Sequence, residues 1–220
     1  MTQYGFYFDN ARCTGCRTCE MACKDFKDLS ETMAFRRIFD YEGGDWKDNG
    51  DGTLSTTSYA YHVSAACNHC ANPACMEACP AGAIEKDSDT RLVFVNQDAC
   101  KGFGACVDAC PYGVPILSKE DNKAYKCDGC IDRVKEGKNP ICVDACPLRA
   151  LEFGPIDDLR AAHPGALDGI APLPDPSQTT PSLAINASAA AKPVGDATGS
   201  VTNEPEVTYV EAREITMAMK

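Results

Sequence analysis

The fifteen cysteines of this 220-residue chain are gathered in four short runs, and this grouping restricts the folds open to it. All fifteen lie between Cys13 and Cys146, and their odd number excludes a chain whose thiols are all paired in disulfides. Thiols grouped this closely are typical of metal ligands rather than of a disulfide framework. The candidate ligands, run by run, are Cys13, Cys16, Cys19 and Cys23; Cys67, Cys70, Cys75 and Cys79; Cys100, Cys106 and Cys110; and Cys127, Cys130, Cys142 and Cys146.

The spacing within the runs points to iron–sulfur clusters. The first run reads C-x2-C-x2-C-x3-C, and the second reads C-x2-C-x4-C-x3-C-P. Closely spaced thiolates, a fourth three residues further on and a following proline are typical of bacterial ferredoxins with two clusters, in which the fourth cysteine ligates the other cluster. A structural zinc site is the alternative, and it explains these run endings less well. His69 lies between two cysteines of the second run, but the thiols already supply full ligand sets without it.

The third run differs from the second at one ligand position. It reads C-x2-F-x2-C-x3-C-P, so Phe103 stands where a further ligand is expected. Phenylalanine has no donor atom, and three thiolates leave one iron of a four-iron cube without a protein ligand. We predict a [3Fe–4S] cluster at this site and [4Fe–4S] clusters at three others. The alternative is a [4Fe–4S] cluster whose last iron binds water or another oxygen ligand.

The four runs predict an α+β fold with two ferredoxin-like modules, each holding two clusters. Nested pairing of the outermost runs is preferred to simple succession, because the two middle runs are near neighbours with matching Cys-Pro endings. The expected domains are residues 1–25 plus 120–160 as one module, 26–66 as an inserted β-hairpin, 67–119 as the other module, and 161–220 as a tail. Nesting assigns Cys13, Cys16, Cys19 and Cys146 to one cluster, Cys23, Cys127, Cys130 and Cys142 to its neighbour, Cys67, Cys70, Cys75 and Cys110 to a third, and Cys79, Cys100 and Cys106 to the last.

Hydrophobic patterning predicts the main elements around the first run and in the insertion. A strand is expected over residues 4–8 and a helix over residues 18–26. Residues 35–41 and 54–63 resemble two strands joined by glycine-rich turns, with Trp46 at the tip of the hairpin. Trp46 either contacts a partner subunit or caps the hairpin locally, and the sequence favours neither alternative.

The composition changes from about Pro155 to proline, alanine, serine and threonine, with few large apolar residues. A segment of this kind cannot bury enough apolar surface to fold alone. It is either a disordered tail or an extended arm that becomes ordered along a partner. We favour the partner-binding arm because scattered apolar residues would serve as anchors, namely Leu183, Ile185, Val194, Val207, Tyr209, Val210 and Ile215.

Composition and motifs exclude several classes of function. The net charge of −11 argues against a nucleic-acid partner, which needs a concentrated basic face. The sequence contains no run of about 18 apolar residues, so no membrane span is predicted, and no signal peptide is recognised. The sequence lacks a nucleophile–base pair, a phosphate-binding glycine loop and a substrate-pocket motif, so no active site is expected. Two classes stay open: an electron-transfer subunit of an oxidoreductase complex, and a soluble polyferredoxin that carries electrons alone.

The runs also resemble a known family in their surroundings. Together with Cys-Asp-Gly-Cys at 127–130 and Cys-Pro-Leu-Arg-Ala-Leu at 146–151, they resemble the iron–sulfur (beta) electron-transfer subunit of the dimethyl sulfoxide reductase family of molybdenum oxidoreductases. The likeness covers about residues 1–160 and is weaker in the tail. It also includes Phe-Arg-Arg-Ile (35–38), Gly-Gly-Asp-Trp (43–46) and Phe-Gly-Pro-Ile-Asp (153–157).

The resemblance implies four clusters with the nested ligand assignment, and two partner subunits. One partner is a catalytic subunit with a molybdopterin guanine dinucleotide cofactor, and the other is an integral membrane anchor that exchanges electrons with quinol. The resemblance further implies a peripheral membrane complex on the extracytoplasmic side, exported with a twin-arginine signal on the catalytic partner. The expected reaction is anaerobic reduction of dimethyl sulfoxide or a similar oxide. Phe103 departs from this pattern, because close relatives have cysteine there and the nitrate reductase type has tryptophan and a three-iron cluster, which leaves the substrate open.

Overall fold

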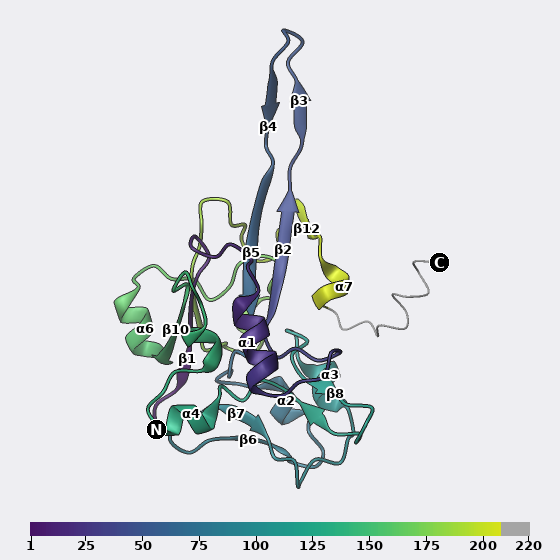
Figure 1. Ribbon diagram of the computed structural model, residues 1–220, viewed down its shortest axis with the longest axis vertical. Coiled ribbons are helices and arrows are strands. Elements are labelled where there is room, and N and C mark those ends of the chain that lie inside the picture. The colour runs from purple at the N-terminus through teal and green to yellow at the C-terminus, as the bar shows by residue number, and fades with distance from the viewer. Residues whose placement is uncertain (208–220) are drawn as a thin grey trace.

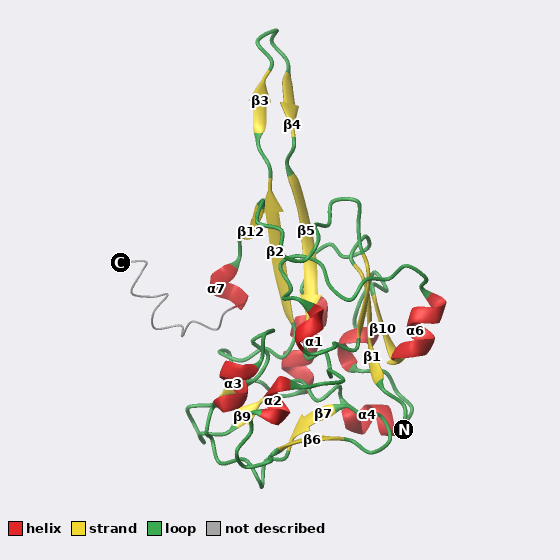
Figure 2. Ribbon diagram, turned by 180° about the vertical axis from the view of Figure 1, so that it is seen from behind, coloured by secondary structure: helices red, strands yellow, loops and turns green. Residues whose placement is uncertain are grey.

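The computed structural model describes residues 1–207, whose body carries a long β-hairpin that rises away from it (Figure 1). One three-stranded sheet continues into this hairpin, a second three-stranded sheet lies beside it, and short helices and two-stranded sheets gather at the opposite end (Figures 1 and 2). This mixture of short elements is the expected α+β architecture. The tail residues Tyr209, Val210 and Ile215 lie outside the described part of the chain.

The first sheet joins segments from both ends of the sequence. Its central strand β1 (Tyr4–Asp9) pairs antiparallel with β10 (Leu151–Pro155) and parallel with β11 (Leu183–Asn186). The segment before β11 approaches so closely that a Cβ at Gly5 would meet the carbonyl oxygen of Ser182 at 2.2 Å. Glycine at this position therefore allows the tail to lie directly on β1.

Both faces of β1 are covered, because its side chains alternate. Phe6 and Phe8 point into the main core. Tyr7 points to the other face, where it packs with Ile156 and Leu159 of α6 (Ile156–Ala162). The strand expected over residues 4–8 thus forms as the middle of a sheet rather than as an edge.

The second sheet supports the hairpin. β2 (Arg37–Gly43) pairs antiparallel with β5 (Tyr59–Ala65) on one side and with β12 (Gly199–Val201) on the other. The two strands expected over residues 35–41 and 54–63 are therefore present with shifted bounds.

Beyond this sheet the hairpin continues as an exposed ribbon of β3 (Trp46–Asp48) and β4 (Leu54–Thr56). The prediction that Trp46 lies at the tip is wrong, because Trp46 pairs with Thr56 on the stalk and residues 49–53 form the turn. Its side chain is 68% exposed, so it does not cap the turn.

The helices that accompany the cysteine runs are short. α1 (Thr18–Phe26) has the predicted bounds, and α4 (Ile131–Lys135) follows Cys130 directly. The others are α2 (Ala74–Glu77), α3 (Ala105–Ala109) and α5 (Ile141–Asp144). Among residues 1–207 no helix combines the length and apolar character needed to cross a membrane.

Two small hairpins lie near the middle runs. β6 (Ile84–Lys86) pairs with β7 (Val93–Val95), and β8 (Ile116–Leu117) pairs with β9 (Ala124–Tyr125). The β8–β9 hairpin crosses the domain boundary expected between residues 119 and 120. Because Ala124 packs with the core around Cys75 and Cys100, this boundary belongs nearer the end of β9.

The tail lies on the body of the protein itself. Residues 176–178 form a 3₁₀ helix, β11 and β12 each add a strand to a sheet, and α7 (Glu204–Val207) packs beside β2. The anchor Ile185 is fully buried in the main core. The expectation that residues 161–207 need a partner for order is therefore corrected. Composition alone underestimated the order of the tail, because two existing sheets offer unpaired edges to which its strands can add.

Candidate metal centres

The fifteen thiols come together as four sets, each drawn from two of the runs. Three sets line small separate cavities, and the thiols of the remaining set lie close enough to affect one another's ionisation. Set A comprises Cys13, Cys16, Cys19 and Cys146; set B comprises Cys23, Cys127, Cys130 and Cys142; set C comprises Cys67, Cys70, Cys75 and Cys110; and set D comprises Cys79, Cys100 and Cys106.

Helical geometry explains how one run serves two sets. The last two cysteines of every run are four residues apart and lie in or just beyond a short helix, so they share one helix face about one turn apart. One thiol of the pair therefore points into one set and the other into the neighbouring set. The pairs are Cys19 and Cys23 at α1, Cys75 and Cys79 at α2, Cys106 and Cys110 at α3, and Cys142 and Cys146 at α5.

The loops between the cysteines direct backbone N–H groups at the sulfurs. Gly129, with φ 72°, turns the Cys127–Cys130 loop so that its N–H donates to Cys127 Sγ at 3.4 Å. A Cβ at Gly129 would meet Leu92 at 2.9 Å, so this close turn requires glycine. The same kind of bond runs from Ala83 to Cys79 at 3.3 Å, from Ala124 to Cys100 at 3.4 Å and from Ala150 to Cys146 at 3.3 Å.

Burial makes several of these thiols weaker acids when no metal is bound. Desolvation raises the pKa of Cys75 and Cys130 to about 12, and that of Cys13 and Cys70 to about 11. Such thiols are neutral at pH 7, whereas a bound metal ion would replace their protons and hold them as thiolates. The negative charge of the thiolates at these sites would therefore depend on a bound cationic group that balances it, and would not arise from ionisation of the free thiols.

Set D is the incomplete one. Its cavity is lined by its three thiols and by the loop 101–105, in which Phe103 is 64% exposed. Gly102 and Gly104 flank this residue with φ of 71° and 73°. The backbone at Phe103 therefore follows the cavity wall while its side chain offers no ligand atom.

Several buried polar atoms around the sets lack a hydrogen-bond partner among the described residues. They include Nε and Nη2 of Arg36, the hydroxyl of Tyr112 and the hydroxyl of Thr179. Tyr112 and Thr179 line the cavity of set C, and Arg36 lies near thiols of sets A and B. An unpartnered buried donor costs about 1–3 kcal/mol, so their gathering here indicates that an anionic group with acceptor atoms belongs in these spaces.

The thiols surround spaces rather than single points. Within residues 1–207, no three Cys, His, Asp or Glu side chains are grouped closely enough to hold one metal ion. A tetrahedral zinc site would need its four ligands about 2.0–2.3 Å from one point. A cluster of several irons bridged by sulfides fits the wider arrangement and supplies the acceptors that the unpartnered donors require.

The sets follow one another in the order A, B, C, D. Arg36 lies between A and B, since charges at Cys19 of set A and at Cys142 and Cys127 of set B act on its guanidinium. Lys126 lies between B and C, because its Nζ is 3.5 Å from Cys67 Sγ and donates to the carbonyl of Cys127 at 2.8 Å. The helix α2 carries one thiol of C and leads directly to one of D.

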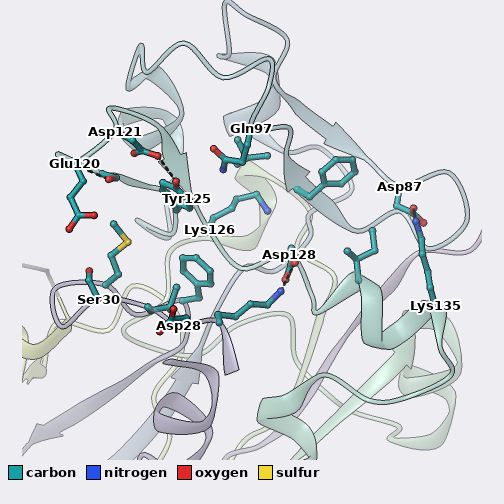
Figure 3. A pocket seen from close by; sticks show the side chains of 18 residues that line it. Asp28, Ser30, Asp87, Gln97, Glu120, Asp121, Tyr125, Lys126, Asp128 and Lys135 are labelled. Atoms are coloured by element: carbon teal, nitrogen blue, oxygen red, sulfur yellow. Dashed lines mark hydrogen bonds and ion pairs between the residues drawn. The ribbon is translucent and has the colours of Figure 1, made fainter. Parts of the chain in front are cut away.

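A groove of about 690 Å³ lies between the end of α1, the β8–β9 hairpin and α4 (Figure 3). Lys27 pairs with Asp128 at 2.7 Å, and Lys135 pairs with Asp87 at 2.8 Å along its wall. Lys126 also lines the groove, which therefore passes beside set C.

Comparison with known proteins assigns these sites to a class. The family described as "4Fe-4S dicluster domain" matches residues 58–156, and the "4Fe-4S binding domain" matches residues 10–31. Over 206 residues the protein is 52% identical to the B subunit of anaerobic dimethyl sulfoxide reductase from Escherichia coli (strain K12), in an alignment that covers 94% of this chain and 99% of that relative. The protein belongs to the family of anaerobic dimethyl sulfoxide reductase B subunits. Another B subunit, from Haemophilus influenzae (strain Rd), is 50% identical over 207 residues, covering 94% of this chain and 100% of the relative.

A more distant iron–sulfur subunit matches a smaller share of the chain. The formate dehydrogenase-O iron–sulfur subunit of Escherichia coli (strain K12) is 31% identical over 174 residues, which is 69% of this chain and 53% of that subunit. As a member of the B-subunit family, the protein is an iron–sulfur electron-transfer subunit of a molybdenum oxidoreductase.

Two residues near the sites received no role from the sequence. The signal for Arg36 in the sequence is a charged residue beside apolar residues at the start of a buried strand. The sequence presents His69 only as a possible ligand, whereas its ring Nε2 lies 4.0 Å from Cys127 Sγ in another set. This contact joins residues 58 positions apart, so spacing within a run carries no signal for it.

Proposed function

We propose that this B subunit relays electrons through four clusters, one in each thiol set, between a quinone-linked membrane anchor and a molybdopterin guanine dinucleotide catalytic subunit. Sets A, B and C would each hold a [4Fe–4S] cluster, because each offers four thiols. Set D would hold a [3Fe–4S] cluster, because Phe103 leaves it with three. The proposed reaction of the complex is anaerobic reduction of dimethyl sulfoxide or a similar oxide.

The observation that carries this proposal is the single row of four sets with accessible ends. At one end Cys16 of set A is exposed, and at the other end Phe103 beside set D is exposed. Most thiols between these ends are buried. Electrons could therefore enter at one end and leave at the other without contact between the inner clusters and water.

The proposed location is a peripheral complex on the extracytoplasmic side of the cell membrane, reached by export with the catalytic partner. Membership of the B-subunit family supports this location. The exposed β3–β4 ribbon offers a surface that such a partner could contact, since all six of its strand residues are exposed.

The test is anaerobic purification of the tagged full-length protein from its native host. We expect about fifteen irons per polypeptide, a brown colour, and copurification of a large molybdenum-containing subunit and a membrane subunit. Oxidation of a quinol analogue by this complex should reduce the clusters. Zinc in place of iron would overturn the proposal, and a fully loaded protein that purifies alone and exchanges electrons freely would favour the soluble polyferredoxin.

A further inference from the structure

Arg36 is a buried cation, and three of its five N–H donors are unpaired among the described residues. Only 2% of its surface is exposed, and its Nη1 donates to the carbonyl and hydroxyl oxygens of Ser64 at 3.3 and 3.0 Å. Its Nε and Nη2 find no partner among the described residues. The guanidinium also stacks over the ring of Phe6, with its carbon 4.8 Å from the ring centroid, so packing holds it in place.

The surroundings of Arg36 contain thiols but no carboxylate that the structure shows bonded to it. Burial alone would lower its pKa, but charges at Cys142, Cys19 and Cys127 outweigh burial and raise it. Arginine keeps its charge at any pH that proteins tolerate. A permanent buried charge without an anionic side-chain partner is unfavourable unless another anion lies beside it.

Ser64 connects this charge to set A. Its hydroxyl oxygen accepts a bond from Arg36 Nη1 and lies 3.6 Å from Cys19 Sγ. Because the oxygen already accepts from arginine, its own hydrogen is free to donate to the sulfur. Arg36 thus reaches set A through a relay and lies directly near the thiols of set B.

We propose that Arg36 is a shared counter-ion of the clusters in sets A and B, which raises the reduction potentials of both. This inference rests on the proposed function, since it presumes that the two sets hold clusters. Reduction adds one negative charge to a cluster, and a fixed positive charge between two clusters stabilises the reduced form of each. Arg36 places a positive charge near the clusters and does not itself react.

The proposal is tested with four single variants of the anaerobically purified complex: Arg36→Gln, Arg36→Lys, Ser64→Ala and Arg12→Gln. Arg12 is the matched control, because it neighbours Cys13 in sequence but its side chain is 63% exposed. Redox titration followed by electron paramagnetic resonance gives each potential, with signals assigned by one Cys→Ser variant in each set. Iron content is measured for every variant.

Arg36→Gln should lower the potentials of clusters A and B by at least the 59 mV that corresponds to a tenfold change in the one-electron equilibrium, and leave C and D unchanged. Arg36→Lys should retain most of the potential, Ser64→Ala should lower cluster A alone, and Arg12→Gln should change nothing. Loss of iron from sets A and B in Arg36→Gln but not in Arg36→Lys would also support a counter-ion.

Unchanged potentials in Arg36→Gln would overturn the inference, as would equal shifts at all four clusters. Equal shifts or equal iron loss in Arg36→Gln and Arg36→Lys would assign the residue to packing instead. Failure of the proposed function would be distinguishable from these results, because it would appear in the unmodified protein as zinc or as missing clusters.

Discussion

His69 bridges two thiol sets: its ring Nε2 lies 4.0 Å from Cys127 Sγ of set B, while its backbone N–H donates to Cys67 Sγ of set C at 3.5 Å. The ring Nδ1 accepts a bond from the backbone N–H of Val93 at 2.9 Å. A neutral imidazole that accepts at Nδ1 carries its hydrogen on Nε2, so this hydrogen points toward Cys127.

The first prediction follows from this contact. His69→Asn keeps an acceptor near the position of Nδ1 and tolerates the backbone φ of 43°, but it removes the hydrogen directed at Cys127. We expect a lower potential for the set B cluster, because fewer hydrogen bonds to a ligand sulfur disfavour the reduced state. Redox titration should show this cluster shifted and the set D cluster unchanged; a rise in potential would contradict the assignment of the tautomer.

Phe103→Cys should complete set D. The new thiol would stand on the loop that lines the three-thiol cavity, so a fourth iron gains a protein ligand. The paramagnetic signal expected from the proposed oxidised [3Fe–4S] cluster should disappear, and iron should rise from about fifteen to about sixteen per polypeptide. Phe103→Leu is the control and should keep the signal. An oxidised wild-type protein without that signal would instead support a four-iron cluster with an oxygen ligand.

Arg37 holds the end of the described chain against the body. Its guanidinium, buried with 6% exposure, donates to the carbonyl of Val207 at 2.7 Å and to those of Tyr112 and Gly113 at 3.1 and 2.8 Å. Arg37→Met should lower the free energy of unfolding by about 3 kcal/mol, since three buried carbonyls lose a charged donor. Limited proteolysis should then cut near α7 sooner than in wild type. Cleavage at an unchanged rate would show that the clamp contributes little.

The tail strand should contribute as much to stability as a core strand. Ile185→Ala leaves a cavity at a fully buried position and should cost about 2–5 kcal/mol in anaerobic denaturant titration. Leu167→Ala is a matched control on the segment that faces β11, and its 46% exposure predicts only a small change. Similar effects of both substitutions would indicate that β11 is loosely held in solution.

Removal of iron should unfold much of the body. Thiols of the four sets belong to three of the hydrophobic cores, so extraction of iron leaves spaces lined by cysteine side chains and unpartnered donors. Chelation under oxidising conditions should abolish cooperative thermal unfolding and protease resistance. Anaerobic addition of iron, sulfide and thiol reductant should restore both. An iron-free protein that keeps its cooperative transition would refute this dependence on the clusters.

The sequence by itself determined the chemistry of the sites. C-x2-C loops and C-x3-C endings act over a few residues, so a loop that turns on Gly129 and a helix such as α1 can be predicted from local spacing. The missing ligand at position 103 can likewise be predicted from a single cysteine run, because the phenylalanine side chain has no donor atom.

Only the tertiary structure decided what lies between the sites and over them. Arg36, Ser64 and Cys19 come from three separate segments, and Ile185 reaches β1 across more than half of the sequence. Such contacts depend on which strands pair, and pairing is set by burial and edge hydrogen bonds over the whole fold rather than by neighbouring residues. The composition of the tail indicates a segment too polar to fold alone. Its strands are stable because they add to sheets that other segments build.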